Sequence, residues 1–177
     1  MLCLVQFSQE FHWVNFRFAE LDALLLLYGI DPCTAYSHSC SCSSADDQCS
    51  HGKDNAFLII NLPGLSVAAS MCERSILIKA IYELWCHGSS LVSAIDQAKL
   101  LTKTFLEPYL SEDKSWSVNV DSHCKSYSMS EKEKCRNHFR FFDFKGKVNL
   151  DDADVQLWVL LDYSQMNRNI EVKFSQN

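Results

Sequence analysis

Short apolar segments alternate with helical segments along the chain, and this order constrains the fold more than any other feature. Buried or half-buried strands are predicted at residues 2–7, 56–63, 75–85, 116–124, 147–150 and 154–163, with 169–174 as a last strand or a tail. Helices are predicted at residues 18–29, 66–74, 90–105 and 126–142, the last of them capped by Ser128 or Ser130. This order predicts an α+β or split βαβ layout in two lobes.

The boundary between the two lobes is expected near Pro108, where the polar run SEDKS follows. On this interpretation residues 1–110 form a first domain and residues 111–177 form a second. Lys99 and Lys103 then fall in the first domain.

Residues 33–54 form a Ser-, Asp- and Cys-rich stretch with no periodicity, which is long enough to be an insertion. It contains Cys33, Cys40, Cys42 and Cys49, and cysteine thiolates are good zinc ligands. Zinc sites favour Cys-x-x-Cys pairs, however, and here the tight pair is Cys40-x-Cys42. The spacing favours a solvated loop, with metal binding as the alternative.

The composition predicts a soluble, cytoplasmic protein with a real core. Hydrophobic residues make up 47% of the 177 and charged residues 21%. The apolar run Leu24 to Leu27 is far too short to span a bilayer, and Met1 to Gln9 is a poor signal peptide. Nine cysteines, an odd number, fit free thiols in a reducing compartment.

Catalytic motifs are scarce in the sequence. None of its five glycines belongs to a phosphate or dinucleotide loop, and there is no Gly-x-Ser-x-Gly elbow. A thiol catalyst can be imagined, for example Cys86 beside His87, but adjacent residues on a strand point to opposite faces. No catalytic residue is predicted.

One segment of this acidic chain carries a positive net charge. The chain carries a net charge of −6, yet residues 123–147 hold seven basic and three acidic side chains. The basic residues are Lys125, Lys132, Lys134, Arg136, Arg140, Lys145 and Lys147. Tyr127 and four phenylalanines are interleaved with them, and bases with aromatics are typical of nucleic-acid binding. The alternative is an amphipathic helix with a solvated basic face, in which Phe139 and Phe142 belong to the core.

Several stretches together resemble one family of RNA-modifying enzymes. RSILIKAIYELWCHGSS (74–90), FFDFKGKVNLDDADVQLWVLLDY (141–163), FRFAELDALLLLYG (16–29) and FLIINLP (57–63) are similar to segments of that family, and they occur in the family's order. It is the family of eukaryotic and archaeal tRNA (guanine-10-N2)-methyltransferases.

The resemblance implies an N-terminal ferredoxin-like domain, then a THUMP-like RNA-binding domain, with no methyltransferase domain in this chain. The sequence has neither an Asp-Pro-Pro-Tyr-like catalytic tetrapeptide nor a glycine-rich S-adenosylmethionine loop. The chain is therefore expected to dock tRNA, to be inactive alone and to bind no cofactor. The family's activator subunit contacts the methyltransferase domain and is not expected to bind this chain.

The resemblance also bears on the C-terminal part. Residues 164–177 match the family poorly, which predicts a truncated product, a splice variant, an incomplete gene model or a fragment. A truncated, non-catalytic form that acts through a protein partner is the alternative function.

Within FKGKVNL, the resemblance implies that Gly146 lets the backbone turn tightly while Lys145 and Lys147 face tRNA phosphates.

Overall fold

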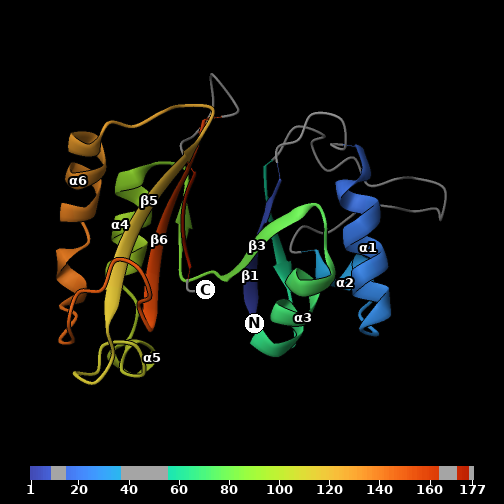
Figure 1. Cartoon of the computed structure of the whole chain (residues 1–177), viewed down its shortest axis with the longest axis horizontal. Coiled ribbons are helices and arrows are strands. Elements are labelled where there is room, and N and C mark those ends of the chain that lie inside the picture. Colours follow the sequence, from blue (N-terminus) through green and yellow to red (C-terminus); the bar gives the residue numbers. More distant parts are fainter. Residues whose placement is uncertain (9–14, 37–55, 164–170, 176–177) are drawn as a thin grey trace. The chain divides into compact units, whose positions relative to one another are not determined.

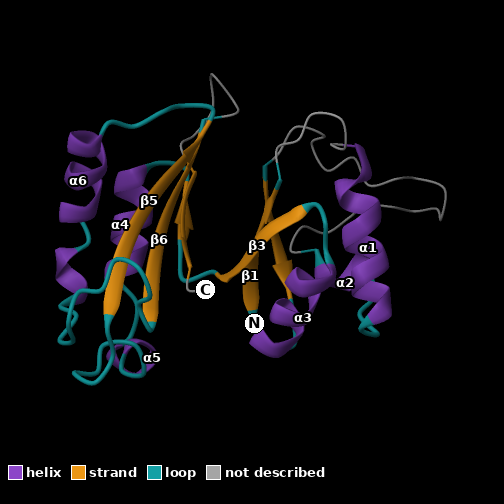
Figure 2. Ribbon diagram, in the orientation of Figure 1, coloured by secondary structure: helices purple, strands orange, loops and turns teal. Residues whose placement is uncertain are grey.

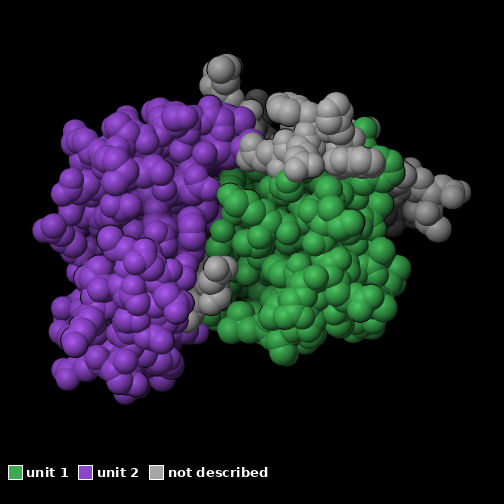
Figure 3. Space-filling view, in the orientation of Figure 1, with its two compact units in different colours: residues 1–83 green, residues 84–177 purple. Residues whose placement is uncertain are grey.

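The computed structural model describes residues 1–8, 15–36, 56–163 and 171–175, the last of these as backbone only. The chain forms two compact units, Met1–Glu83 and Leu84–Asn177 (Figure 3). We call them unit 1 and unit 2. Each combines a β-sheet with helices, which confirms the predicted α+β class (Figure 2).

Unit 1 is built on a three-stranded antiparallel sheet. The strand order is β2-β1-β3, with β1 at Leu2–Phe7, β2 at Phe57–Asn61 and β3 at Ile78–Glu83. The central strand β1 is buried along almost its whole length, as its continuous apolar sequence predicts. Gln6 is buried there, and its side-chain carbonyl accepts a hydrogen bond from the Tyr82 hydroxyl at 2.8 Å.

Helices α1 (Arg17–Leu27) and α3 (Leu65–Arg74) cover one face of this sheet, and the short helix α2 (Pro32–Ala35) lies beside α1 (Figure 1). Leu21 and Leu25 of α1 and Met71 of α3 pack against alternate residues of β1 in one core. Glu20 fixes α1 to the turn before β3, because its carboxylate accepts hydrogen bonds from the Ile76 and Leu77 amides.

Unit 2 contains a four-stranded mixed sheet with the order β4-β7-β6-β5. Strands β5 (Trp116–His123) and β6 (Val155–Asp162) are parallel, and helix α6 (Met129–Asn137) lies between them in sequence. Strand β7 (Glu171–Ser175) is antiparallel to β6 and to the two-residue strand β4 (His87–Gly88).

Helices α4 (Leu91–Lys99) and α6 lie on one side of the unit 2 sheet, and α5 (Lys103–Leu106) follows α4 (Figure 1). The core combines side chains of α4, β6 and the short 3-10 helix η2 (Arg140–Phe142). Ser128 begins α6 with a capping box, in which its hydroxyl accepts from the Glu131 amide and Glu131 accepts from the Ser128 amide. This confirms Ser128 as the cap, one of the two serines that the sequence offers.

The structure divides the chain into its two compact units between Glu83 and Leu84, rather than near residue 110 where the sequence places the domain boundary. Residues 84–110 pack into unit 2, since the Trp85 ring lies 5.8 Å from that of Phe142. Strand β4 also pairs with β7, which comes from the other end of the chain. Such a long-range pairing leaves no local signal, whereas the polar run after Pro108 is only a turn within the unit.

The structure also shows the conformation of two short stretches for which the sequence predicts or allows a strand. Residues 147–150, predicted as a strand, form only an isolated bridge between Val148 and Trp116. The stretch 169–174, for which the sequence allows a strand or a tail, supplies β7. Most of the 33–54 stretch lies outside the described residues, and within the described part no helix is long and apolar enough to cross a membrane.

Candidate nucleic-acid interface

The seven basic side chains predicted to bind RNA all lie in unit 2, between the end of β5 and the start of β6. Lys125 precedes α6, three more residues lie on α6, Arg140 lies on η2, and Lys145 and Lys147 follow in the loop to β6. The structure brings Arg136 and Arg140 together at one cavity. The five lysines of the set do not line that cavity.

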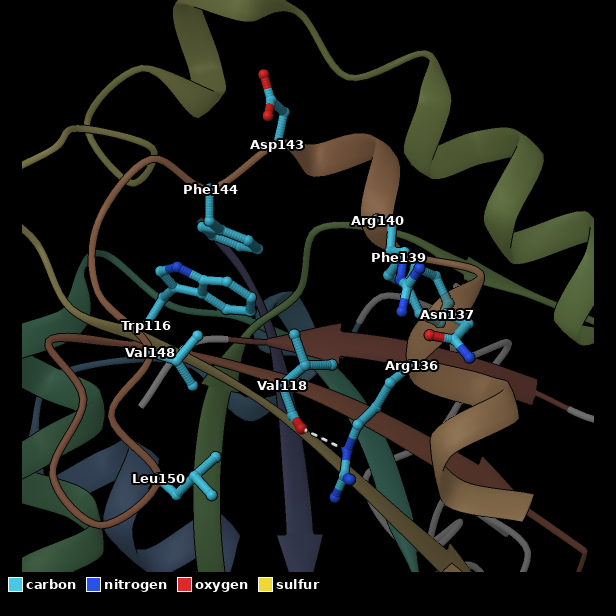
Figure 4. Close-up of a pocket in the computed structure, with 10 residues that line it drawn as sticks. All are labelled: Trp116, Val118, Arg136, Asn137, Phe139, Arg140, Asp143, Phe144, Val148 and Leu150. Atoms are coloured by element: carbon cyan, nitrogen blue, oxygen red, sulfur yellow. Dashed lines mark hydrogen bonds between the residues drawn. The ribbon is translucent and has the colours of Figure 1, made fainter. Parts of the chain in front are cut away.

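This cavity, which we call the arginine cavity, has a volume of about 360 Å³. Its lining comes from β5, α6, η2 and the loop before β6: Trp116, Val118, Arg136, Asn137, Phe139, Arg140, Asp143, Phe144, Val148 and Leu150. Figure 4 shows the Trp116 and Phe144 rings on one side and the α6 and η2 side chains on the other. The site therefore has an aromatic wall opposite a basic wall.

The two arginines are held differently. Nε of Arg136 donates to the Val118 carbonyl oxygen at 2.9 Å, which ties the last turn of α6 to β5 (Figure 4). Arg140 is exposed. A guanidinium offers five N–H donors, so Arg136 keeps donors for a ligand while it is anchored through Nε. Planar donors of this kind match phosphate oxygens well.

The aromatic wall is a stacked pair. The Trp116 and Phe144 rings are 4.9 Å apart between centroids and inclined by 16°. The indole Nε1 of Trp116 donates to the Gly146 carbonyl at 2.9 Å, and the Trp116 amide donates to the Lys147 carbonyl at 2.9 Å. These bonds hold the loop 143–148 against the start of β5.

Gly146 is needed here because the backbone of Lys114 lies very close to it. A Cβ on Gly146 would lie 1.7 Å from the Lys114 carbonyl oxygen, far inside any real contact. The left-handed residue of this loop is Asp143, with φ of 50°. The backbone bends at Gly146, and a glycine is needed there because the neighbouring backbone excludes a side chain.

The predicted lysines differ in their surroundings. The Lys125 ammonium lies over the rings of Tyr127 and Tyr163, at 4.9 and 5.2 Å from their centroids. Lys145 forms an exposed ion pair with Asp143. Burial, together with a hydrogen bond to the Tyr163 hydroxyl, raises the pKa of Tyr127 above its usual value. Cation–π contacts and exposed ion pairs are weak, so both lysines can still meet a phosphate.

Two phenylalanines of the basic segment belong to the core, as predicted. Phe139 and Phe142 are each only 2% exposed, which confirms them as core residues. The sequence does not reveal the pairing of Trp116 with Phe144. Its alternation places Trp116 on the buried face of a strand, and only the return of the loop after Asp143 brings Phe144 to it.

The metal and thiol candidates do not form a site in the described part of the chain. Cys33 is exposed, while Cys40, Cys42 and Cys49 lie outside the described residues, so zinc binding there stays a prediction. No group of three potential metal ligands occurs among the described residues. Cys86 is buried, its thiol contacts the Ala94 carbonyl, and burial raises its pKa to about 12, which disfavours the thiolate that a nucleophile needs.

Two solved structures share this fold. PH1313 from Pyrococcus horikoshii aligns with a TM-score of 0.57 at 11% identity, over 99% of this chain and 54% of that chain. A 4-thiouridine synthetase, solved in complex with RNA and ATP, aligns with a TM-score of 0.50 at 9% identity, over 99% of this chain and 41% of the other. At these identities the likeness defines the fold class.

Relatives in sequence identify the family more specifically than these solved structures do. The tRNA (guanine(10)-N(2))-methyltransferase TRMT11 of Gallus gallus is 28% identical over 157 residues, and that of Homo sapiens is 29% identical over 150 residues. These alignments cover 89% and 85% of this chain, but only 31% and 30% of the relatives. Residues 1–176 match the family model described as the Tmrp11 THUMP N-terminal domain. The chain belongs to this family, which confirms the resemblance noted from the sequence.

Proposed function

We propose that this chain is the tRNA-docking part of a tRNA (guanine-10-N2)-methyltransferase and that unit 2 contacts the RNA. The observation that carries the proposal is the arginine cavity, where Arg136 and Arg140 face the stacked Trp116–Phe144 pair. Guanidinium groups neutralise backbone phosphates, and an aromatic face accepts an unpaired base. The names of the relatives and the RNA-bound fold neighbour support tRNA as the nucleic acid.

Catalysis is assigned to a part of the enzyme that residues 1–177 do not supply. The chain spans about a third of its relatives, and its sequence contains no Asp-Pro-Pro-Tyr tetrapeptide. We therefore expect purified 1–177 to transfer no methyl group to tRNA when S-adenosylmethionine is added. We also expect no binding of the activator subunit. Reproducible methylation of guanine by this chain alone would refute the docking role.

The direct test replaces one arginine in the cavity and one outside it. Arg140→Gln removes an exposed charge from the cavity, and Arg74→Gln removes an exposed arginine from α3 in unit 1. Removing one phosphate-neutralising charge should lower the slope of log K against log salt by about 0.7–0.9. We expect this change for Arg140→Gln and none for Arg74→Gln, measured by tRNA binding at several salt concentrations.

Two outcomes would contradict the proposal. An equal change in both variants would mean that tRNA responds only to the overall charge of the chain. No binding by the wild-type chain would remove the RNA-binding role and favour the alternative, a non-catalytic protein-interaction module.

A further inference from the structure

A second hollow lies on unit 2 beside the arginine cavity. Its volume is about 610 Å³, and it is lined by α4, α5 and the chain that follows each of them, together with Phe141, Phe142, Asp143 and Lys145. Three of its lining residues are lysines, namely Lys99, Lys103 and Lys145, so we call it the lysine groove. Lys99 and Lys103 come from the stretch that the sequence pattern assigns to the other domain.

The arginine cavity and the lysine groove share a wall. Asp143 lines both, and Phe144 lines the first while Phe142 and Lys145 line the second. In Figure 4 the side chain of Asp143 leaves the backbone on the side opposite to Phe144. The residues 141–145 therefore form a narrow ridge between two adjacent sites on the same unit.

The lysines of the groove are available to an anion. Lys103 is exposed and forms no ion pair among the described residues. Lys99 pairs with Asp96 at 3.5 Å, with side chains 55% and 66% exposed, and Lys145 pairs with Asp143 in an equally open position. Exposed ion pairs of this kind contribute little to stability, so a phosphate can replace the carboxylate at either ammonium group. Glu107 and Asp143 are the carboxylates that line the groove.

Much of the rest of the groove is apolar. Its floor includes the buried side chains of Ala98, Leu106 and Phe142, and Phe141 is 38% exposed. Lysines are point charges that neutralise phosphates without distinguishing sequence. The residues of the groove thus match a sugar–phosphate backbone better than an unpaired base.

We propose that the lysine groove binds backbone phosphates of the same RNA that enters the arginine cavity, so that the strand crosses the ridge 141–145. This inference rests on the proposed function, because it extends the RNA path from the first site onto α4 and α5. Lys99 and Lys103 each neutralise one phosphate, and Lys145 on the ridge neutralises a third.

The test compares paired charge removals. Lys99→Gln with Lys103→Gln changes two exposed residues at the ends of short helices, and Arg74→Gln with Lys79→Gln changes two exposed residues of unit 1. We expect the groove variant to lower the salt slope of tRNA binding by about 1.4–1.8, because two phosphates are no longer neutralised. The change should be the same for RNAs of different sequence. The unit 1 variant should keep the wild-type slope, and both should melt like wild type.

The outcomes separate this inference from the proposed function. If Arg140→Gln lowers the slope but the groove variant does not, RNA binds the cavity and our proposal for the groove is wrong. Polyglutamate serves as a probe for binding of acidic protein segments. If the groove variant keeps the wild-type salt slope for tRNA but binds polyglutamate more weakly than wild type, the groove is a surface for acidic protein segments and the proposal is again wrong. If wild type binds no tRNA, both fail together.

Discussion

Replacing Gly146 by alanine tests whether the loop that builds the aromatic wall is held by close backbone packing. The new Cβ would meet the Lys114 carbonyl oxygen at 1.7 Å, so the loop or the start of β5 must move. Forcing an extra carbon into a packed site costs about 1–3 kcal/mol. If the loop moves instead, it weakens the hydrogen bonds from Trp116 to the Gly146 and Lys147 carbonyls. Each of these bonds contributes about 1 kcal/mol to the free energy of unfolding. Both routes predict a destabilisation of about 2 kcal/mol.

This destabilisation is measured as the change in the free energy of unfolding, by urea denaturation followed by circular dichroism. Tryptophan fluorescence reports in parallel on the stacking of Trp116 against Phe144. Gly64→Ala is the matched control, because a Cβ at that position would have nothing within 4 Å and its backbone is extended. We expect the control to lose less than about 1 kcal/mol, because alanine is a poorer N-cap than glycine but meets no neighbouring atom here. If Gly146→Ala is as stable as Gly64→Ala, close packing at Lys114 does not hold this loop.

Two further predictions concern local capping and acid stability. Ser128→Ala should cost about 1 kcal/mol in urea denaturation, because it removes the acceptor for the Glu131 amide, while Ser130→Ala inside the helix should cost much less. The Asp154 carboxylate accepts from the Ser115 hydroxyl and amide at 2.6 and 2.7 Å, and these bonds lower its pKa. Its contribution to stability is therefore present above the unfolded value of about 3.9 and is lost as the pH falls through the lower folded pKa. Below about pH 4 the wild type should lose stability more steeply than Asp154→Asn, and parallel acid-unfolding curves would contradict this.

Local patterns predict most of the regular elements. The apolar stretch 2–7 is the buried central strand β1, and the serine before the acidic turn at Glu131 is the cap of α6. Both depend on residues within one or two turns of each other, where propensity and capping act. The prediction for the short stretch 147–150 fails because its backbone bonds to Trp116 through one bridge, and no ladder forms.

Pairings between distant segments are not predictable in the same way. Strand β4 has only His87 and Gly88, and it exists because Lys173 and Val172 lie opposite them. Two residues carry no detectable period, so the sequence cannot assign this segment to unit 2. A boundary placed at the next polar run therefore separates α4 and α5 from the rest of unit 2.

The same limit affects the candidate site. Counting charge along the chain singles out residues 123–147, because they are net positive. A bound phosphate instead responds to charges that are near it in space, since the Debye length is about 8 Å at physiological salt. The fold brings Lys99 and Lys103 to the groove that Lys145 also lines, and unit 2 carries a net charge of only −1 while unit 1 carries −5. An acidic chain can therefore present a basic face, and the residues that build this face have to be sought by proximity rather than by segment.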